Sequence, residues 1–372
     1  MEYKNLLLLL IFTGSLCGCS SPGKNSAVLT PISTVVQPPE KTKLVVFAAG
    51  SLIVPFQELE QAFEAVYPEI DVQMEYHGSI QVIRHVTEIH EEIDVVASAD
   101  AALIPQLMFQ SIIPETDQPY ADWSIRFAGN KLALAYQKKS HYADEITSDN
   151  WAEILARPDV RLGLSDPRFD ALGYRALMAF ALQEAAQQNY SLFTPMFTGQ
   201  FNPPVTIFRE ESSTQISVPE ILETASSAHI LMRGASIQLV ALLQSGDIDY
   251  AFEYESVIRQ HGLKMLALAN TVNLGISEMD SFYRQVEVEL DFKRFASIQP
   301  QFFGERIGYG ITIPNNAPHP EAAEKFIAFL LSEPGRAVME KNYHPMFTQP
   351  LSEGFENLPQ SLIKFVEPMD GS

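Results

Sequence analysis

The chain has 372 residues, of which 46% are hydrophobic and 19% are charged, a composition typical of globular proteins and too apolar for a disordered one. Its 25 Lys and Arg stand against 46 Asp and Glu, giving a formal net charge of -21, which argues against a nucleic-acid partner and against a polybasic membrane contact. The two cysteines, Cys17 and Cys19, both lie near the N-terminus. This placement excludes a disulfide framework, a thiolate zinc site and a cysteine nucleophile in the rest of the chain.

The first nineteen residues have the pattern of an export signal. Lys4 precedes an unbroken apolar run over 6–12, which is too short to span a bilayer and has the length of a signal-peptide core. Small residues then flank Cys19, as in a bacterial lipobox, and we predict that 1–19 form a lipoprotein signal with Cys19 as the lipidated residue. The alternative is an ordinary secretory signal in which the cysteines play no part.

The segment 20–42 is rich in Ser, Pro, Thr and Lys and lacks helical periodicity. We predict that it is a flexible tether, which leaves the folded body outside the cytoplasm, either anchored to the cell membrane by its lipid or periplasmic. At roughly 150 residues per domain, the remaining length suggests two lobes, each large enough to bury its own core.

The body alternates strand patterns with helix patterns. Strands are predicted over 44–49, 70–75, 94–98, 131–136, 161–164, 248–254 and 307–313. Helices are predicted over 56–66, 80–86, 101–108 with Asp100 as its cap, 151–156, around 177–182, 236–245 and 321–331. This alternation argues for mostly parallel sheets with helices on both faces, whereas 188–230 shows no clear pattern.

Four strand-to-helix turns carry Ser, Asp or Gly where a helix begins, at 49–52, 77–80, 170–174 and 233–236. The N-terminus of a helix has unpaired N–H groups and a partial positive charge, so it attracts anions. In doubly wound sheets such turns gather at the carboxyl ends of the strands, where ligands bind. Ordinary helix capping explains any one of these turns as well, but together they indicate a protein that binds an anionic solute.

Longer stretches of sequence carry a resemblance to a known family. They include FAAGSL at 47–52, DVVASAD at 94–100 and DYAFEY at 249–254, with shorter matches at 54–56, 78–79, 102–108, 173–175, 242–246 and 260–263. In this order they resemble the tungstate/molybdate-binding proteins of ABC transporters, most closely the archaeal-type branch. The resemblance implies an α/β fold of the periplasmic-binding-protein type II class, in which two doubly wound lobes joined by a hinge close on the ligand. We expect one lobe over 43–130 plus 309–372, the other over 131–308, and a monomer.

The resemblance also implies which residues touch the oxyanion. In the first lobe these are Ser51 and Ser79 with the backbone at Gly50, and in the second lobe Asp170, Ala171, Leu172, Ser236 and Tyr254. Ser236 stands where the family has a glutamate, and Leu172 stands where it often has a cysteine. In the archaeal-type branch that glutamate and an aspartate bring carboxylate oxygens to the metal atom, so Asp170 is a candidate ligand to the Mo or W atom.

The loss of the glutamate leaves two outcomes open. The site holds a four-coordinate oxyanion by hydrogen bonds alone, or another carboxylate compensates. Glu253 is the carboxylate near Tyr254 in the sequence, but strand alternation points it to the opposite face.

The chemistry of the anions narrows the choice. Molybdate, tungstate and sulfate are fully deprotonated at neutral pH and need only hydrogen-bond donors, so we expect neutral hydroxyls and amides without a cationic side chain. Phosphate retains a proton and needs an acceptor, which Asp170 could provide. Otherwise a carboxylate beside a dianion is repulsive, and Asp170 then binds the metal atom, is protonated, or faces away and caps its helix.

The sequence therefore predicts a lipid-anchored, non-enzymatic solute-binding protein that captures molybdate or tungstate and delivers it to the permease of an ABC importer, with no cofactor besides this ligand. A binder of sulfate or phosphate, a sensor lipoprotein and a secreted two-lobed hydrolase are the alternatives. His85 and His90, with acidic neighbours, lie on different faces of the predicted helix and are interpreted as a solvated surface.

Overall fold

A computed structural model describes residues 41–225, 228–291 and 300–369. The predicted signal, the lipidation site Cys19 and almost all of the predicted tether lie outside these residues. Within the described ranges, no helix is both long enough and apolar enough to cross a bilayer.

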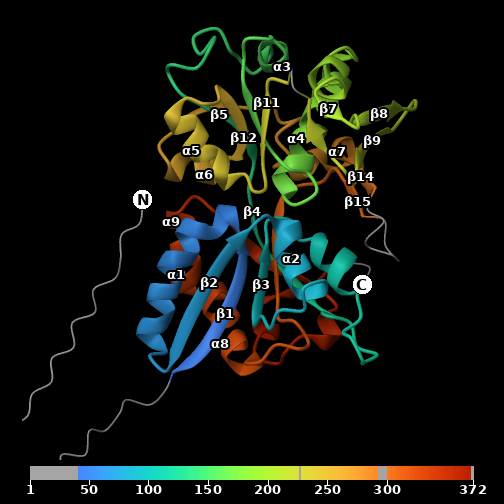
Figure 1. Cartoon of the computed structure of the whole chain (residues 1–372). Coiled ribbons are helices and arrows are strands. Elements are labelled where there is room, and N and C mark those ends of the chain that lie inside the picture. Colours follow the sequence, from blue (N-terminus) through green and yellow to red (C-terminus); the bar gives the residue numbers. More distant parts are fainter. Residues whose placement is uncertain (1–40, 226–227, 292–299, 370–372) are drawn as a thin grey trace, which may run out of the picture. The chain divides into compact units, whose positions relative to one another are not determined.

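Lobe 1 is built on a seven-stranded sheet with the order β18-β17-β4-β16-β3-β1-β2 (Figure 1). Its strands are β1 (Thr42–Ala49), β2 (Ile70–His77), β3 (Val95–Ser98), β4 (Ser124–Gly129), β16 (Gly308–Thr312), β17 (Met346–Glu353) and β18 (Glu367–Pro368). Its α-helices are α1 (Ile53–Val66), α2 (Ser79–Thr87), α8 (Pro320–Leu331) and α9 (Glu333–Lys341). Short turns of helix follow at Gly50–Leu52, Ile104–Met108, Phe355–Asn357 and Ile363–Phe365.

Lobe 2 contains a five-stranded sheet with the order β11-β6-β12-β5-β13, a four-stranded sheet with the order β15-β14-β9-β8, and the pair β10-β7. The five-stranded sheet consists of β5 (Leu132–Tyr136), β6 (Leu162–Ser165), β11 (Ile230–Arg233), β12 (Tyr250–Tyr254) and β13 (Lys264–Ala267). The smaller sheets consist of β7 (Phe201–Asn202), β8 (Thr206–Arg209), β9 (Thr214–Pro219), β10 (Glu223–Thr224), β14 (Val286–Asp291) and β15 (Gln301–Phe303). The helices are α3 (Trp151–Leu155), α4 (Ala171–Gln187), α5 (Ile237–Ser245), α6 (Glu255–Gln260), α7 (Asp280–Tyr283) and short turns at Thr194–Thr198 and Ser277–Met279.

The pairing within the two main sheets is mixed, which corrects the expectation of mostly parallel sheets. In lobe 1, β2, β1 and β3 run parallel, but β16 runs antiparallel to both β3 and β4. In lobe 2, β5 runs antiparallel to β12, which is parallel to β6. The chain leaves lobe 1 through β4, enters lobe 2 through β5 and returns to lobe 1 through β16. Because β4 leads out of lobe 1 and β16 leads back into it, these two neighbouring strands run in opposite directions.

Helix α4 is buried along most of its length because it is covered on more than one side. It contacts β6 and β12 of the five-stranded sheet and also β9 and β14 of the four-stranded sheet. Its side chains are buried from Ala171 through Glu184, the behaviour of a helix without a solvent face. The N-terminus of α4 is therefore held firmly at the end of β6, where the predicted contact residues lie.

The two-lobed α/β fold predicted from the sequence is confirmed by this arrangement of sheets. We propose that 43–130 plus 309–372 form one lobe and 131–308 the other, because the strands of the two main sheets divide there except for Thr42 and Gly308, which belong to the seven-stranded sheet.

Candidate functional site

Ser51 lies in the turn that follows β1, where the chain enters α1. Its side chain is buried, with 3% of the residue exposed, and its Oγ accepts a hydrogen bond from the Tyr309 hydroxyl at 3.0 Å. Tyr309, on β16, in turn accepts from Nδ2 of Asn130 at 3.1 Å. Because the protein donates to Ser51, the hydroxyl hydrogen of Ser51 remains free for a ligand.

Ser79 begins α2 and is oriented in the same way. It is 2% exposed, and its Oγ accepts from the backbone N–H of Ala99 at 3.0 Å. The carbonyl of Ala99 accepts from Nη1 of Arg175 at 2.8 Å. Ala99 therefore contacts both Ser79 in lobe 1 and Arg175 in lobe 2.

Tyr254 ends β12 and contacts a cation, which the sequence analysis did not expect. Nη1 of Arg175 donates to the Tyr254 hydroxyl at 2.7 Å, and the side chain of Arg175 is only 3% exposed. The rings of Tyr254 and Tyr309 lie with their centroids 6.0 Å apart. The prediction of a site without cationic side chains is therefore wrong, because a buried guanidinium lies against one of its hydroxyls.

The charge of Arg175 is balanced across the lobes. Nη2 of Arg175 forms an ion pair with Oδ2 of Asp100 at 3.0 Å, and the Tyr174 hydroxyl donates to the same oxygen. Asp100 also accepts from the N–H of Ala102 at 3.1 Å, but the helical turn runs over Ile104–Met108 with Leu103 at its N-cap position, so the predicted capping of a helix over 101–108 by Asp100 is wrong. Burial is the largest single influence on the pKa of Arg175 and lowers it, but Asp100, Tyr254 and Tyr174 together outweigh burial, and the pKa is raised.

Asp170 caps α4 and links two helix starts. Its Oδ1 accepts from the N–H of Leu172 at 2.7 Å, and its Oδ2 accepts from the N–H of Ser236 at 2.9 Å. Burial raises the pKa of Asp170 to about 6, and the two N–H groups oppose that rise. Of the three roles left open by the sequence, these bonds favour the helix cap.

The remaining predicted residues surround Asp170. Ala171 and Leu172 are fully buried in the first turn of α4, and Ser236 is 3% exposed at the start of α5. The structure therefore brings Asp170, Ala171, Leu172 and Ser236 together around the carboxyl ends of β6 and β11.

Glu253 lies closer to the predicted contact residues than its strand face alone suggests. Alternation along β12 does place it opposite Tyr254, yet it is fully buried and lies within electrostatic reach of Asp170 and the Ser236 side chain. The face opposite Tyr254 is covered by α5, whose first turn also belongs to the site. Strand alternation alone could not reveal that Glu253 lies near the site, because a helix begins on each side of β12, α4 on the side of Tyr254 and α5 on the side of Glu253.

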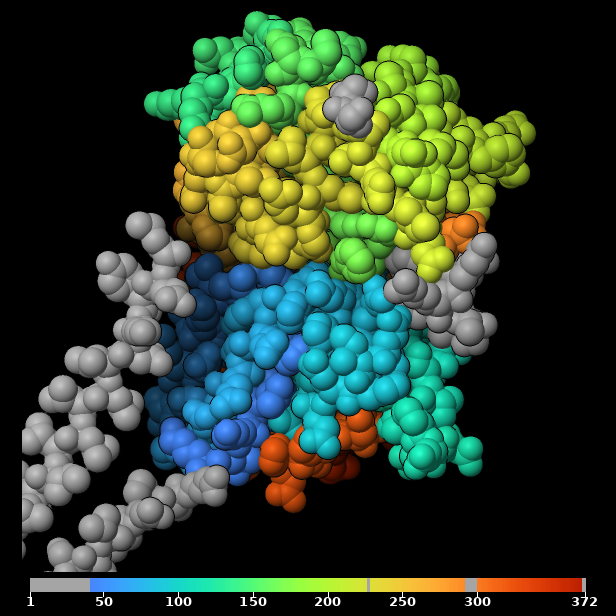
Figure 2. All heavy atoms as spheres, in the orientation of Figure 1, coloured from blue at the N-terminus to red at the C-terminus, as the bar shows by residue number. Residues whose placement is uncertain are grey.

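Two glycines let the lobes approach each other. A Cβ at Gly78 would overlap the carbonyl oxygen of Phe169, and a Cβ at Gly50 would lie 2.8 Å from Cγ2 of Ile237. The same Phe169 carbonyl accepts from the N–H groups of Ile80 at 3.0 Å and Gln81 at 3.2 Å. In Figure 2 the atoms around 230–260 (yellow) lie directly against those around 50–90 (blue to cyan), so the lobes are in contact over these turns.

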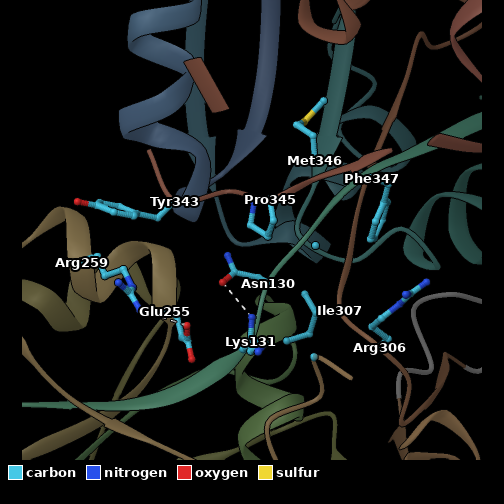
Figure 3. A pocket seen from close by; sticks show the side chains of 12 residues that line it. Asn130, Lys131, Glu255, Arg259, Arg306, Ile307, Tyr343, Pro345, Met346 and Phe347 are labelled. Carbon is cyan, nitrogen blue, oxygen red and sulfur yellow. Dashed lines mark hydrogen bonds and ion pairs between the residues drawn. The ribbon is translucent and has the colours of Figure 1, made fainter. Parts of the chain in front are cut away.

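A separate cavity of about 200 Å³ lies beside the strand connections between the lobes. Figure 3 shows its lining, with Asn130 and Lys131 from the β4–β5 connection facing Arg259, Tyr343 and neighbouring residues. Nδ2 of Asn130 donates to Ser256 at 2.8 Å as well as to Tyr309. One hinge residue thus contacts both lobe 2 and the tyrosine that holds Ser51.

Of the two histidines in the predicted His/Glu surface, His85 lies on α2 and His90 follows the end of that helix. Within the described ranges no group of three or more His, Cys, Asp or Glu residues could hold a metal ion. His90 is exposed, and His85 stacks on His77 with ring centroids 4.7 Å apart and pairs with Glu91 at 3.1 Å.

Sequence reasoning missed Arg175, Asp100, Tyr309 and Asn130 as members of the network. Arg175 lay within a stretch that carried the family resemblance, and Asp100 had been assigned only a capping role. Tyr309 and Asn130 gave no local signal, because their partners lie more than a hundred residues away in the chain.

Comparison with known proteins agrees with this architecture. The chain matches the family described as bacterial extracellular solute-binding protein over residues 44–343. It is 36% identical over 333 residues to the molybdate/tungstate-binding protein WtpA of Pyrococcus abyssi, covering 87% of this chain and 90% of that one. It is 37% identical over 325 residues to an uncharacterized solute-binding protein of Petrotoga mobilis, again covering 87% and 90%.

A solved structure supports the fold. The sulfate-binding protein SubI of Mycobacterium tuberculosis superposes with a TM-score of 0.52 at 13% identity, covering 88% of this chain and 92% of that one. The resemblance predicted from the sequence is thus confirmed at the level of the family and its named relatives. The chain belongs to the bacterial extracellular solute-binding protein family.

Proposed function

We propose that this protein captures molybdate or tungstate between its lobes. The observation that carries the proposal is the orientation of three buried hydroxyls, those of Ser51, Ser79 and Tyr254. Each accepts a hydrogen bond from the protein, and none donates one within the described part of the chain. Three hydroxyl hydrogens are therefore available to a ligand that only accepts, as a fully deprotonated oxyanion does.

The surrounding charges support an anionic ligand. The guanidinium of Arg175 pairs with Asp100 on one side and lies against the Tyr254 hydroxyl on the other, and in a buried setting its charge acts more strongly than it would in water. The net charge of -21 does not oppose this, because surface charges are screened over about 8 Å at physiological salt. Relatives named for molybdate and tungstate, at 36% and 33% identity, favour these anions over the alternatives.

We propose the following roles for the other predicted residues. Gly50 permits close approach of the lobes, while Asp170 holds the first turns of α4 and α5 together. Ala171 and Leu172 present the backbone of the α4 N-terminus. With Ser236 in place of the family's glutamate, the anion remains four-coordinate unless another group intervenes.

The wider role follows from the family. Membership in an extracellular solute-binding family implies a location outside the cytoplasm. We propose that Cys19 carries a lipid that anchors the protein to the membrane, that the protein is a monomer, and that it delivers the oxyanion to the permease of an ABC importer without breaking a bond.

Sulfate is the second candidate, because it is also a fully deprotonated tetrahedral dianion and the same donors suit it. Titration calorimetry of the mature chain with molybdate, tungstate, sulfate and phosphate, each alone and in competition, tests the proposal. We expect heat with molybdate and tungstate and displacement of sulfate by either. Absence of binding to all four anions contradicts the proposed function.

Native mass spectrometry of the purified protein in an equimolar mixture of the four anions gives an independent measure. The expected spectrum contains one molybdate or tungstate per chain. A spectrum dominated by phosphate would reassign the site to an anion that carries a proton.

A further inference from the structure

One carboxyl oxygen of Glu253 has no hydrogen-bond partner among the residues that the structure describes. The residue lies in β12, opposite Ala133 of β5, and is fully buried. Its Oε2 accepts from the N–H of Tyr254 at 3.0 Å, whereas Oε1 is buried without a hydrogen-bond partner. A buried polar atom left unpaired costs about 1–3 kcal/mol, so its position calls for a reason.

The surroundings of Glu253 are the candidate site. It shares a strand face with Ala251, which packs with Leu239 and Leu243 of α5, so its side chain is on the α5 side of the sheet. Ser236, at the start of α5, lies close enough to influence Glu253, although no hydrogen bond of ordinary geometry joins the Ser236 hydroxyl to Oε1.

The charged and titratable groups near Glu253 come from several elements. Asp170 at the start of α4 acts on it directly, and Tyr309 of β16 is affected by it in turn. Arg175 of α4 also acts on Tyr309, while α5 carries no titratable side chain along its length.

These surroundings favour the neutral, protonated form of the Glu253 carboxyl. Burial first, and then the charge of Asp170, raise the pKa of Glu253 to about 8. A neutral carboxyl has one O–H donor. Because Oε2 already accepts from the backbone, that donor is at Oε1, and none of the described residues accepts from it.

We propose that Glu253 is a contact of the bound oxyanion, its Oε1 donating a hydrogen bond to one anion oxygen, and that it favours fully deprotonated anions over hydrogen phosphate. This inference rests on the proposed function. It assigns to Glu253 a donor role, distinct from metal ligation, beside the position where Ser236 replaces the family's glutamate. Hydrogen phosphate has one fewer strongly accepting oxygen, since one of its oxygens carries a proton.

The test compares two substitutions of similar size. Glu253→Gln keeps a donor, and we expect oxyanion affinity within about threefold of the unsubstituted protein. Glu253→Met removes the donor, and we expect affinity for molybdate to fall about 10- to 100-fold, with a smaller fall for phosphate. Glu211→Met, the same change at an exposed position, is the control and should leave affinity unchanged.

The outcomes separate this inference from the proposed function. If the unsubstituted protein binds none of the four anions, the proposed function fails. If it binds them and Glu253→Met binds equally well, the proposed function stands and the contact to Glu253 is overturned.

A spectroscopic measurement covers the case in which Glu253→Met does not fold. Infrared difference spectra of the unsubstituted protein should show a protonated carboxyl stretch that moves to lower frequency when molybdate binds. That band should be missing in Glu253→Gln. A band in the unsubstituted protein that does not move on binding would overturn the inference.

Discussion

Hydrogen-bond direction at single residues determines what the proposed site can accept. Ser51 and Ser79 each receive a bond from a group that is itself fixed, the Tyr309 hydroxyl at 3.0 Å and the Ala99 amide at 3.0 Å. The hydroxyl hydrogens of Ser51 and Ser79 therefore already point away from these partners before a ligand binds. This preorganisation suits an anion that must exchange its hydration shell for protein donors.

Removal of either hydroxyl should therefore weaken oxyanion binding. Ser51→Ala and Ser79→Ala should each reduce affinity by about 1–3 kcal/mol, because one anion oxygen loses its donor and the fixed partner loses its acceptor. Titration calorimetry with molybdate measures the loss. Ser148→Ala, at an exposed serine, should have no effect, and unchanged affinity in both site variants would mean that the anion binds elsewhere.

The buried carboxyls predict how stability depends on pH. The pKa of Glu253 is raised from 4.5 to about 8 and that of Asp170 from 3.8 to about 6, in both cases chiefly by burial. The folded state holds these protons more tightly than the unfolded state, so it is favoured at low pH. The stabilisation is complete below the unfolded values and is lost as pH rises through the folded values.

Glu253→Gln should remove part of this dependence. Between pH 6 and about 8 the anion-free protein should lose stability by up to about 1.4 kcal/mol per pH unit for the group that titrates. The Gln variant should lose less over that interval. Urea unfolding at several pH values measures the difference, with Glu211→Gln as the exposed control, and parallel curves for the two variants would refute the expectation.

At the scale of elements, the ion pair between Asp100 and Arg175 fastens α4 to the turn after β3. Both side chains are almost fully buried, at 6% and 3% exposure. Breaking such a pair on one side leaves an uncompensated charge and costs about 3–5 kcal/mol.

Asp100→Asn should therefore destabilise the protein strongly, whereas Tyr174→Phe, which removes one bond to the same oxygen, should cost about 1 kcal/mol. An oxyanion beside Arg175 would replace the lost countercharge, so molybdate should raise the melting temperature of Asp100→Asn by more than that of the unsubstituted protein. Thermal unfolding with and without molybdate measures this. Equal increases would place the anion away from Arg175.

Elements with strong local patterns were predictable and those defined by distant partners were not. The predicted helix closed by Gly246 is α5, where Gly246 has a φ of +86°, and the predicted strand 44–49 is β1. In contrast, the four-stranded sheet was missed, because β8 and β9 lie within 188–230, which shows no clear pattern, and β9 finds its other partner in β14, far along the chain. Within the site, the contact between Ser51 and Tyr309 could not be predicted, because the two residues are 258 positions apart in the chain. The turns around Ser51 and Ser79 could be predicted, because their local sequence is typical of a strand followed by a helix.

At the scale of the whole molecule, ligand capture by lobe closure requires that the backbones of the two lobes approach closely. Gly78 is the tightest of the approach points on lobe 1, because an added Cβ would meet both the Phe169 carbonyl oxygen and the Gly234 oxygen. Its backbone angles, φ -64° and ψ 146°, are accessible to alanine. A substitution there therefore probes contact between the lobes without straining the backbone.

Gly78→Ala should hold the lobes apart while each lobe remains folded. We expect molybdate affinity to fall at least 10-fold, since the Ser79 and Tyr254 hydroxyls could no longer reach one anion together. Small-angle scattering should show a larger radius of gyration that molybdate does not reduce. Gly234→Ala is the matched control, because a Cβ there meets nothing within 4 Å, and it should bind and contract normally. If Gly78→Ala binds molybdate as well as Gly234→Ala does, capture does not depend on this approach of the lobes.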